Sequence, residues 1–185
     1  MTGLIILVII VAVLGYGVYL YNDLVKNRQL SQEGWSGIDV QLKRRTDLIP
    51  NLLETVKGYM SHERETLEAV VKARADATSA ANASPEERAR VEGALSGALG
   101  KLLAIAEAYP DLKANTTFLE FQQALQTVED ELQLSRRYYN GTVRNLNTAV
   151  ESFPSVIVAN MFKFDKAEYF ELENPADRAV PSVKF

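Results

Sequence analysis

The residues best suited to chemistry are His62 and Glu63, which begin the stretch HERE. A histidine followed by a glutamate opens the zinc-protease signature HExxH, in which two histidines bind the metal and the glutamate acts as a base. The second histidine is missing, since His62 is the only one in the chain, and there is no cysteine. We therefore expect no metal, no cofactor and no catalytic residue. A hydrolase with an unfamiliar site at His62 and Glu63 is kept as an alternative.

A basic cluster, Lys43, Arg44 and Arg45, lies within a run of helical apolar spacing. Arg45 occupies a position where that spacing places core residues, and an unpaired buried charge costs several kcal/mol. We therefore expect Arg45 to pair with a carboxylate, and Glu129 and Glu131 are both candidates. In the alternative interpretation the cluster binds lipid headgroups near the membrane, as part of a sensor or shaper of its surface.

A second mixed stretch, RRYYN, combines cations and aromatic side chains in the middle of a helical pattern. Aromatic and arginine side chains are common both in packed helix contacts and in the hot spots of interfaces. Packing is the structural interpretation, and a surface for a partner is the functional one. The candidate interaction residues are Lys43, Arg44, His62, Glu63, Arg136, Arg137, Tyr138, Tyr139 and Asn140.

The elements that must position these residues begin with an apolar run, Leu4–Tyr21, that carries no charge. At a rise of about 1.5 Å per residue it spans roughly 27 Å, which is enough to cross a bilayer. It predicts a retained transmembrane anchor at residues 4–21, because the flanks lack the features of a cleavable signal. Lys26 and Arg28 follow the run, so the positive-inside rule favours a cytoplasmic domain with the N-terminus outside.

Helical periodicity dominates the rest of the chain, and the sequence predicts an all-α fold. We expect an antiparallel up-and-down bundle of about four long helices over residues 22–163 and an extended tail over residues 164–185 that packs on it. A helix break is expected near Pro50 or Gly58, with Asp47 and Pro50 as the joint where a new helix starts. Ser84 should cap another helix. Gly93, Gly97 and Gly100 are expected to permit close helix contacts.

Two long stretches, residues 44–63 and 109–164, resemble the LemA family of bacterial membrane-anchored proteins. The similarity extends from Tyr21 to the C-terminal VPSVKF and so covers nearly the whole soluble part. The resemblance implies a helical bundle behind an N-terminal anchor. It implies no established reaction, substrate or cofactor.

These features together predict a single-pass scaffold or adaptor of the bacterial cell membrane. Its partners would be the bilayer, through residues 4–21, and either further copies of itself or another membrane protein. A net charge of −4 with mixed signs gives no basic patch for nucleic acid. The residues point to no small-molecule substrate.

Overall fold

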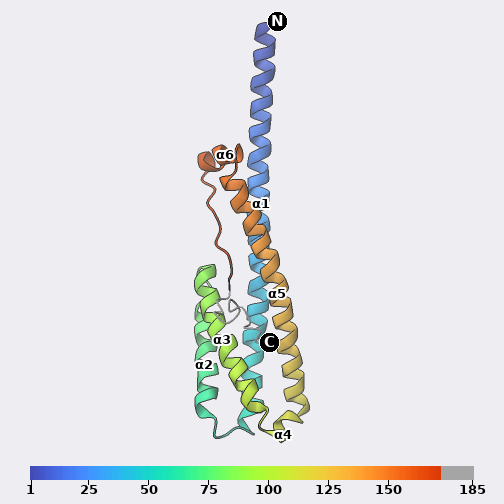
Figure 1. Cartoon of the computed structure of the whole chain (residues 1–185), viewed down its shortest axis with the longest axis vertical. Coiled ribbons are helices and arrows are strands. Elements are labelled where there is room, and N and C mark those ends of the chain that lie inside the picture. The colour runs from blue at the N-terminus through green and yellow to red at the C-terminus, as the bar shows by residue number, and fades with distance from the viewer. Residues whose placement is uncertain (172–185) are drawn as a thin grey trace, which may run out of the picture. The chain divides into compact units, whose positions relative to one another are not determined.

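The computed structural model describes residues 1–171, and these are almost entirely helical (Figure 1). The helices are α1 (Thr2–Lys57), α2 (Arg64–Ser79), α3 (Pro85–Ala106), α4 (Pro110–Lys113), α5 (Thr116–Glu151) and α6 (Ser155–Phe162). No strand occurs within this described range, so the all-α prediction is confirmed. The antiparallel arrangement of about four helices stays a prediction.

The described chain divides into two compact units. The first contains residues 1–38 and 135–169, and the second contains residues 39–134 and 170–171. Both α1 and α5 contribute to each unit. The predicted tail has no regular secondary structure over residues 164–171, and its remainder, residues 172–185, lies outside the described residues.

In the first unit, the N-terminal part of α1 exposes apolar side chains on every side. Ile10 is 50% exposed and Leu4 71%, and the apolar residues between them lie at similar values. This part of α1 is long and apolar enough to cross a membrane, and none of it is buried within the protein. Such a surface is unfavourable in water, which makes the segment a candidate membrane span.

The rest of the first unit has its own apolar core, built from α1, the end of α5, α6 and the following residues. Its buried members are Leu24, Leu146, Val150, Ala159 and Phe164. A second contact brings Trp35 against Tyr139, with ring centroids 5.3 Å apart. Gly34 permits this approach, because a Cβ placed there would lie 3.0 Å from the Tyr139 Cα.

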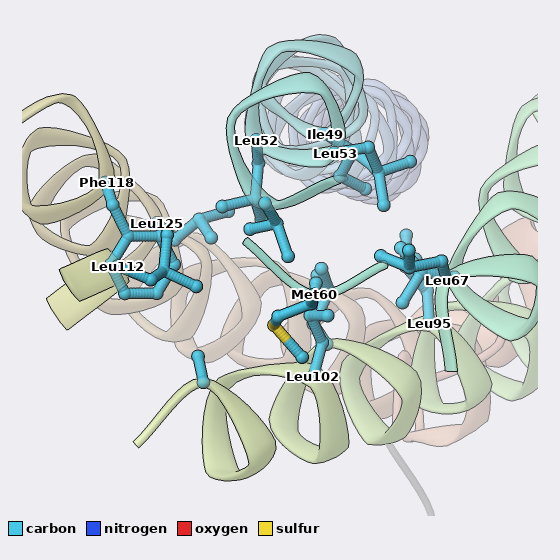
Figure 2. Close-up of a cluster of buried hydrophobic side chains, with 14 of the residues drawn as sticks. Ile49, Leu52, Leu53, Met60, Leu67, Leu95, Leu102, Leu112, Phe118 and Leu125 are labelled. Carbon is cyan, nitrogen blue, oxygen red and sulfur yellow. The ribbon is translucent and has the colours of Figure 1, made fainter. Parts of the chain in front are cut away.

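The second unit has a larger core, to which α1, α2, α3, α4 and α5 all contribute. Figure 2 shows Leu52 and Leu53 of α1, Met60, Leu102 of α3, and Leu112 and Phe118 projecting into this cluster. Within the unit, α2 and α3 pack directly against each other. Ser84 caps α3 as predicted, since its Oγ accepts a hydrogen bond from the Glu87 N–H.

The predicted helix joint at Asp47 and Pro50 is wrong, because α1 continues through Pro50 to Lys57. A proline cannot donate the usual hydrogen bond to the carbonyl four residues earlier, here that of Thr46. In the structure the Nε of Arg74, on α2, donates to the Thr46 oxygen at 3.0 Å. The orphaned carbonyl therefore has a partner, and burial of Ile49 and Leu52 on either side holds the helix together.

The break lies instead at residues 58–63, the second position that the sequence suggested. Met60, which is fully buried, anchors this turn in the core. Tyr59 accepts a hydrogen bond from the Asn115 side chain, and Glu63 accepts one from the Tyr109 hydroxyl. The turn is therefore fixed from both sides by packing and by polar contacts.

The three glycines of α3 do not mediate close contacts, which corrects the expectation for them. A Cβ at Gly93, Gly97 or Gly100 would meet no atom within 4 Å. The close approach occurs at Gly34 instead, where the nearest atom belongs to the backbone of α5.

We expect Gly34→Ala to destabilise the protein, whereas Gly97→Ala should stabilise it. The new methyl at position 34 would force α1 and α5 apart, and overpacking of this kind costs about 1–3 kcal/mol. At position 97 the methyl meets open space, and alanine is favoured over glycine in a helix by up to about 1 kcal/mol. Thermal unfolding of both full-length variants in detergent micelles, followed by circular dichroism, measures the difference. Equal shifts of the two variants would contradict it.

We expect Pro50 and Arg74 to be energetically coupled. Arg74→Met leaves the Thr46 carbonyl without its donor, but in a Pro50→Ala background the backbone N–H of the new alanine can replace it. The cost of Arg74→Met should therefore be larger with Pro50 present, by about 1 kcal/mol, the net value of a typical hydrogen bond. Chemical denaturation of the wild type, both single variants and the double variant measures this coupling. Simple additivity would show that the hydrogen bond to Thr46 contributes nothing.

Candidate functional site

A buried cluster of charged side chains lies in the second unit, centred on Arg45 of α1. Arg45 is 1% exposed, and its Nη2 lies 2.5 Å from Oε2 of Glu92, on α3, which is fully buried. Its Nη1 lies 2.5 Å from Oε1 of Glu129, on α5, and 2.8 Å from the Ser96 hydroxyl oxygen. One guanidinium therefore connects three helices.

A second arginine, Arg88 of α3, completes the cluster from the other side of Glu92. Its Nε lies 3.1 Å from the remaining carboxylate oxygen of Glu92, and its Nη2 lies 3.2 Å from Asp39. Its Nη1 also donates to the Ala80 carbonyl. Both oxygens of the buried Glu92 carboxylate thus accept from a guanidinium, which is the arrangement that a buried charge requires. Among the side-chain nitrogen and oxygen atoms of the described residues, only Nε of Arg45 is buried without a hydrogen-bond partner.

The structure brings Arg45 and Glu129 together but places Glu131 elsewhere. Glu131 pairs with Arg44, at 2.5 Å between Oε2 and Nη1, and both side chains are roughly half exposed. Glu92 and Arg88 are the cluster members that the sequence interpretation missed. The cluster holds helices together and leaves no open face where a substrate could reach Glu92.

The proposed lipid-binding surface at Lys43, Arg44 and Arg45 is not formed as expected. Arg45 points into the core, and Arg44 is engaged with Glu131, so two of the three cations neutralise carboxylates of their own chain. Lys43 is exposed. A single lysine is a weak attraction for an anionic surface, worth about 1 kcal/mol.

The RRYYN stretch separates into a buried and an exposed part. Tyr139 is 4% exposed, and its hydroxyl donates to the Glu168 carbonyl at 2.8 Å, so for this residue the packing interpretation holds and the surface interpretation is wrong. Burial, together with the negative charge of Glu168, raises the pKa of Tyr139 to about 12. Arg137 and Tyr138 are exposed, whereas Arg136 and Asn140 are partly buried.

His62 and Glu63 do not assemble into a catalytic arrangement. His62 is exposed in the turn after α1, while Glu63 accepts the hydrogen bond from Tyr109 at 3.2 Å. Partial burial, reinforced by this hydrogen bond, raises the pKa of Tyr109. Over residues 1–171 no group of three or more histidines, cysteines, aspartates or glutamates is placed to hold a metal ion.

A shallow groove of about 370 Å³ runs between α1 and α5 within the second unit. It is lined by Arg44, Asp47, Leu48, Ala124, Thr127 and Val128. Asp47, predicted to start a helix, thus lies on the wall of this groove within α1. One carboxylate, one hydroxyl and a guanidinium already paired with Glu131 provide no nucleophile beside a base.

The exposed apolar segment and the helical units that follow it define an all-helical protein of the membrane-associated class. The model of the LemA family matches residues 34–185, which is most of the chain, and the chain belongs to this family. The match excludes the apolar segment and includes every residue of the charged cluster.

The chain is similar to bacterial proteins named LemA and MamQ. Protein LemA of Metamycoplasma hominis is 27% identical over 152 residues, an alignment that covers 81% of this chain and 68% of that protein. Magnetosome protein MamQ of Magnetospirillum gryphiswaldense is 24% identical over 180 residues, with 84% and 66% covered. The two MamQ proteins of Paramagnetospirillum magneticum match to the same extent. The chain thus spans about two thirds of the length of these relatives.

We expect Arg45→Met to destabilise the protein far more than Arg44→Met, although the two arginines are neighbours and each binds a glutamate of α5. Removal of Arg45 leaves buried Glu92 with only part of its compensating charge, and breaking such a pair costs about 3–5 kcal/mol. Arg44 is half exposed, and a surface pair contributes about 0–1 kcal/mol. Chemical denaturation of full-length protein in micelles measures both values. Similar losses would show that the cluster is not the main electrostatic constraint.

Proposed function

We propose that this chain is a single-pass membrane scaffold or adaptor that acts through protein–protein contacts or self-association and catalyses no reaction. The observation that carries the proposal is the exposed apolar segment within residues 4–21, none of which is buried in the protein and which continues within one helix into the packed core. The candidate span and the residues that follow it belong to the same helix, α1, which runs without a break from Thr2 to Lys57.

The placement of the charged side chains supports a role in binding more than a role in catalysis. The buried ionic groups, Arg45, Arg88 and Glu92, bind one another and leave no group free to act on a substrate. The exposed candidates, Lys43, His62, Arg137 and Tyr138, offer cations and aromatic surface of the kind that protein interfaces use. Three relatives are named as magnetosome proteins, and none of the relatives' names refers to a reaction.

We further propose that the helical units face the cytoplasm and the N-terminus lies outside. Lys26 and Arg28 follow the candidate span and are both exposed, and positive charge beside a span favours the cytoplasmic side. In this orientation Lys26 and Arg28 lie in the cytoplasm, the side on which positively charged loops are more frequent.

Photo-cross-linking in native membranes tests the interaction. A photoreactive amino acid at Tyr138 or His62 should give discrete higher-mass species, identified by mass spectrometry as multiples of the chain or as one partner protein. The same amino acid at Val71, which is 50% exposed and apolar, provides a matched control. The scaffold proposal fails if the two candidate positions give no more product than Val71.

Single cysteines test the anchor and the orientation, because the chain has no cysteine of its own. We expect a cysteine at Thr2 to react with a membrane-impermeant maleimide in intact cells, and one at Glu65 to react only after lysis. The reverse pattern would place the helical units on the outer side. Extraction of the protein by alkaline carbonate would show that residues 4–21 do not span a bilayer.

A further inference from the structure

The first unit carries an exposed apolar surface that neither the anchor nor the helical core explains. It lies on α6 and on the turn before it, and its members are Phe153, 81% exposed, Ile157, 53%, and Met161, 69%. Ile157 and Met161 are four residues apart within α6 and so share one face of the helix, while Phe153 lies in the turn before it. Phe162, 55% exposed, extends this face. We refer to these four residues as the α6 face.

The opposite side of α6 is fixed to the core of the first unit. Ala159 is fully buried there, and Val158 packs beside it. The start of the helix is held by Ser155, whose hydroxyl lies 2.6 Å from the Ala149 carbonyl oxygen and 2.8 Å from that of Ser152. Because one side of α6 is held against the core, its orientation is fixed, and the face opposite this contact is exposed.

Aromatic contacts place α6 at one particular level of α1. The ring centroids of Phe162 and Tyr21, the last residue of the candidate span, lie 4.8 Å apart, and those of Phe164 and Tyr21 lie 5.7 Å apart. The guanidinium of Arg28 lies over the same Phe164 ring, at 4.9 Å. The chain from Phe162, the last residue of α6, to Phe164 thus contacts both the last residue of the candidate span and the first arginine after it.

That level is where a bilayer changes from acyl chains to headgroups, if residues 4–21 cross it. Tyrosines gather at this boundary, and arginines mark the headgroup side. Helix α6 itself carries no charged residue. Lys163 follows it directly, and beyond Asp165 the next lysine, Lys166, pairs with Glu151 at 2.8 Å. A short helix without charge is suited to lie in the plane of the interface, with its apolar face turned toward the acyl chains.

We propose that the α6 face inserts into the interfacial layer of the same bilayer that the anchor crosses, as a second contact with lipid beside the span. The occupant of this surface is lipid, because the surface is continuous with Tyr21 and with the apolar segment that ends there. Two contacts on one rigid unit fix the tilt and rotation of α1 in the membrane, which one span alone does not. The inference rests on the proposed anchor, and its test separates the two.

The test uses full-length protein reconstituted in vesicles, with single cysteines that carry an environment-sensitive fluorophore. Position 157 or 161 reports on the α6 face, position 11 on the anchor, and position 71, exposed and apolar on α2, serves as the control. We expect lipid-borne nitroxides to quench most of the emission at 157 and 161 when the nitroxide lies near the headgroup. A nitroxide deep in the acyl chains should quench position 11 most strongly. Position 71 should respond to aqueous iodide alone.

Each other outcome has one meaning. If position 11 is quenched by lipid while 157 and 161 respond only to iodide, the anchor stands and the α6 proposal is overturned. If 157 and 161 are shielded from both quenchers, a protein covers the face, and the lipid proposal is equally overturned. If position 11 is not quenched by lipid, the proposed anchor itself fails. Circular dichroism of each labelled protein verifies that the helices are intact.

Discussion

The constraint on which the second unit depends is the burial of the Glu92 carboxylate. A fully buried carboxylate is tolerated only with opposite charge and with hydrogen bonds to its oxygens, and here Arg45 and Arg88 each supply one guanidinium. Arg45 comes from α1 and also reaches Glu129 on α5, so the relative positions of three helices follow from one charge. Apolar side chains of different shape could replace one another in a neighbouring layer, but the geometry of these ion pairs accepts little change. The cluster thus selects one register of the helices within the unit, a role that buried polar groups serve in other helical assemblies.

The same principle accounts for the unbroken passage of α1 through Pro50. The proline removes one donor from the helix, and the carbonyl of Thr46 would be left unsatisfied. Arg74 on α2 supplies the missing hydrogen bond, so a local defect of one helix becomes a contact with the next. Arginine is well suited to this position, because its Nε can donate to a carbonyl while the rest of the side chain packs along the helix. A packed neighbour of this kind explains how a helix persists where propensity alone would end it.

The sequence predicts those features of this structure that depend on neighbouring residues in one segment, and it fails for those that depend on contacts between helices. The apolar run at residues 4–21 and the helical spacing are local, and the all-α fold follows from them. The need of Arg45 for a carboxylate could also be predicted, but its choice among partners depends on helix rotation, which is not local. The signal for Arg88 and Glu92 was present, since they precede Leu95, Leu99 and Leu102 at alternating intervals of four and three. When only apolar residues are counted in a periodic pattern, the charged residues that share the same buried face of the helix are missed. The partner of Thr46 could not be found in this way, because Arg74 reaches it from another helix.

The two units differ in how they distribute exposed apolar surface. In the second unit most apolar side chains of α1 turn inward, and the buried ionic groups are paired. In the first unit the same helix exposes apolar side chains on all sides over the candidate span, and α6 adds a further apolar face at its end. Water favours the first pattern and lipid the second, so a helix anchored as proposed would meet both solvents in sequence. The boundary would then fall near Tyr21, which packs against Phe162, and the first arginine follows at Arg28. Under both proposals the first unit shapes the passage of α1 out of the membrane, and its small core, fixed to α6, keeps the two apolar surfaces at one level.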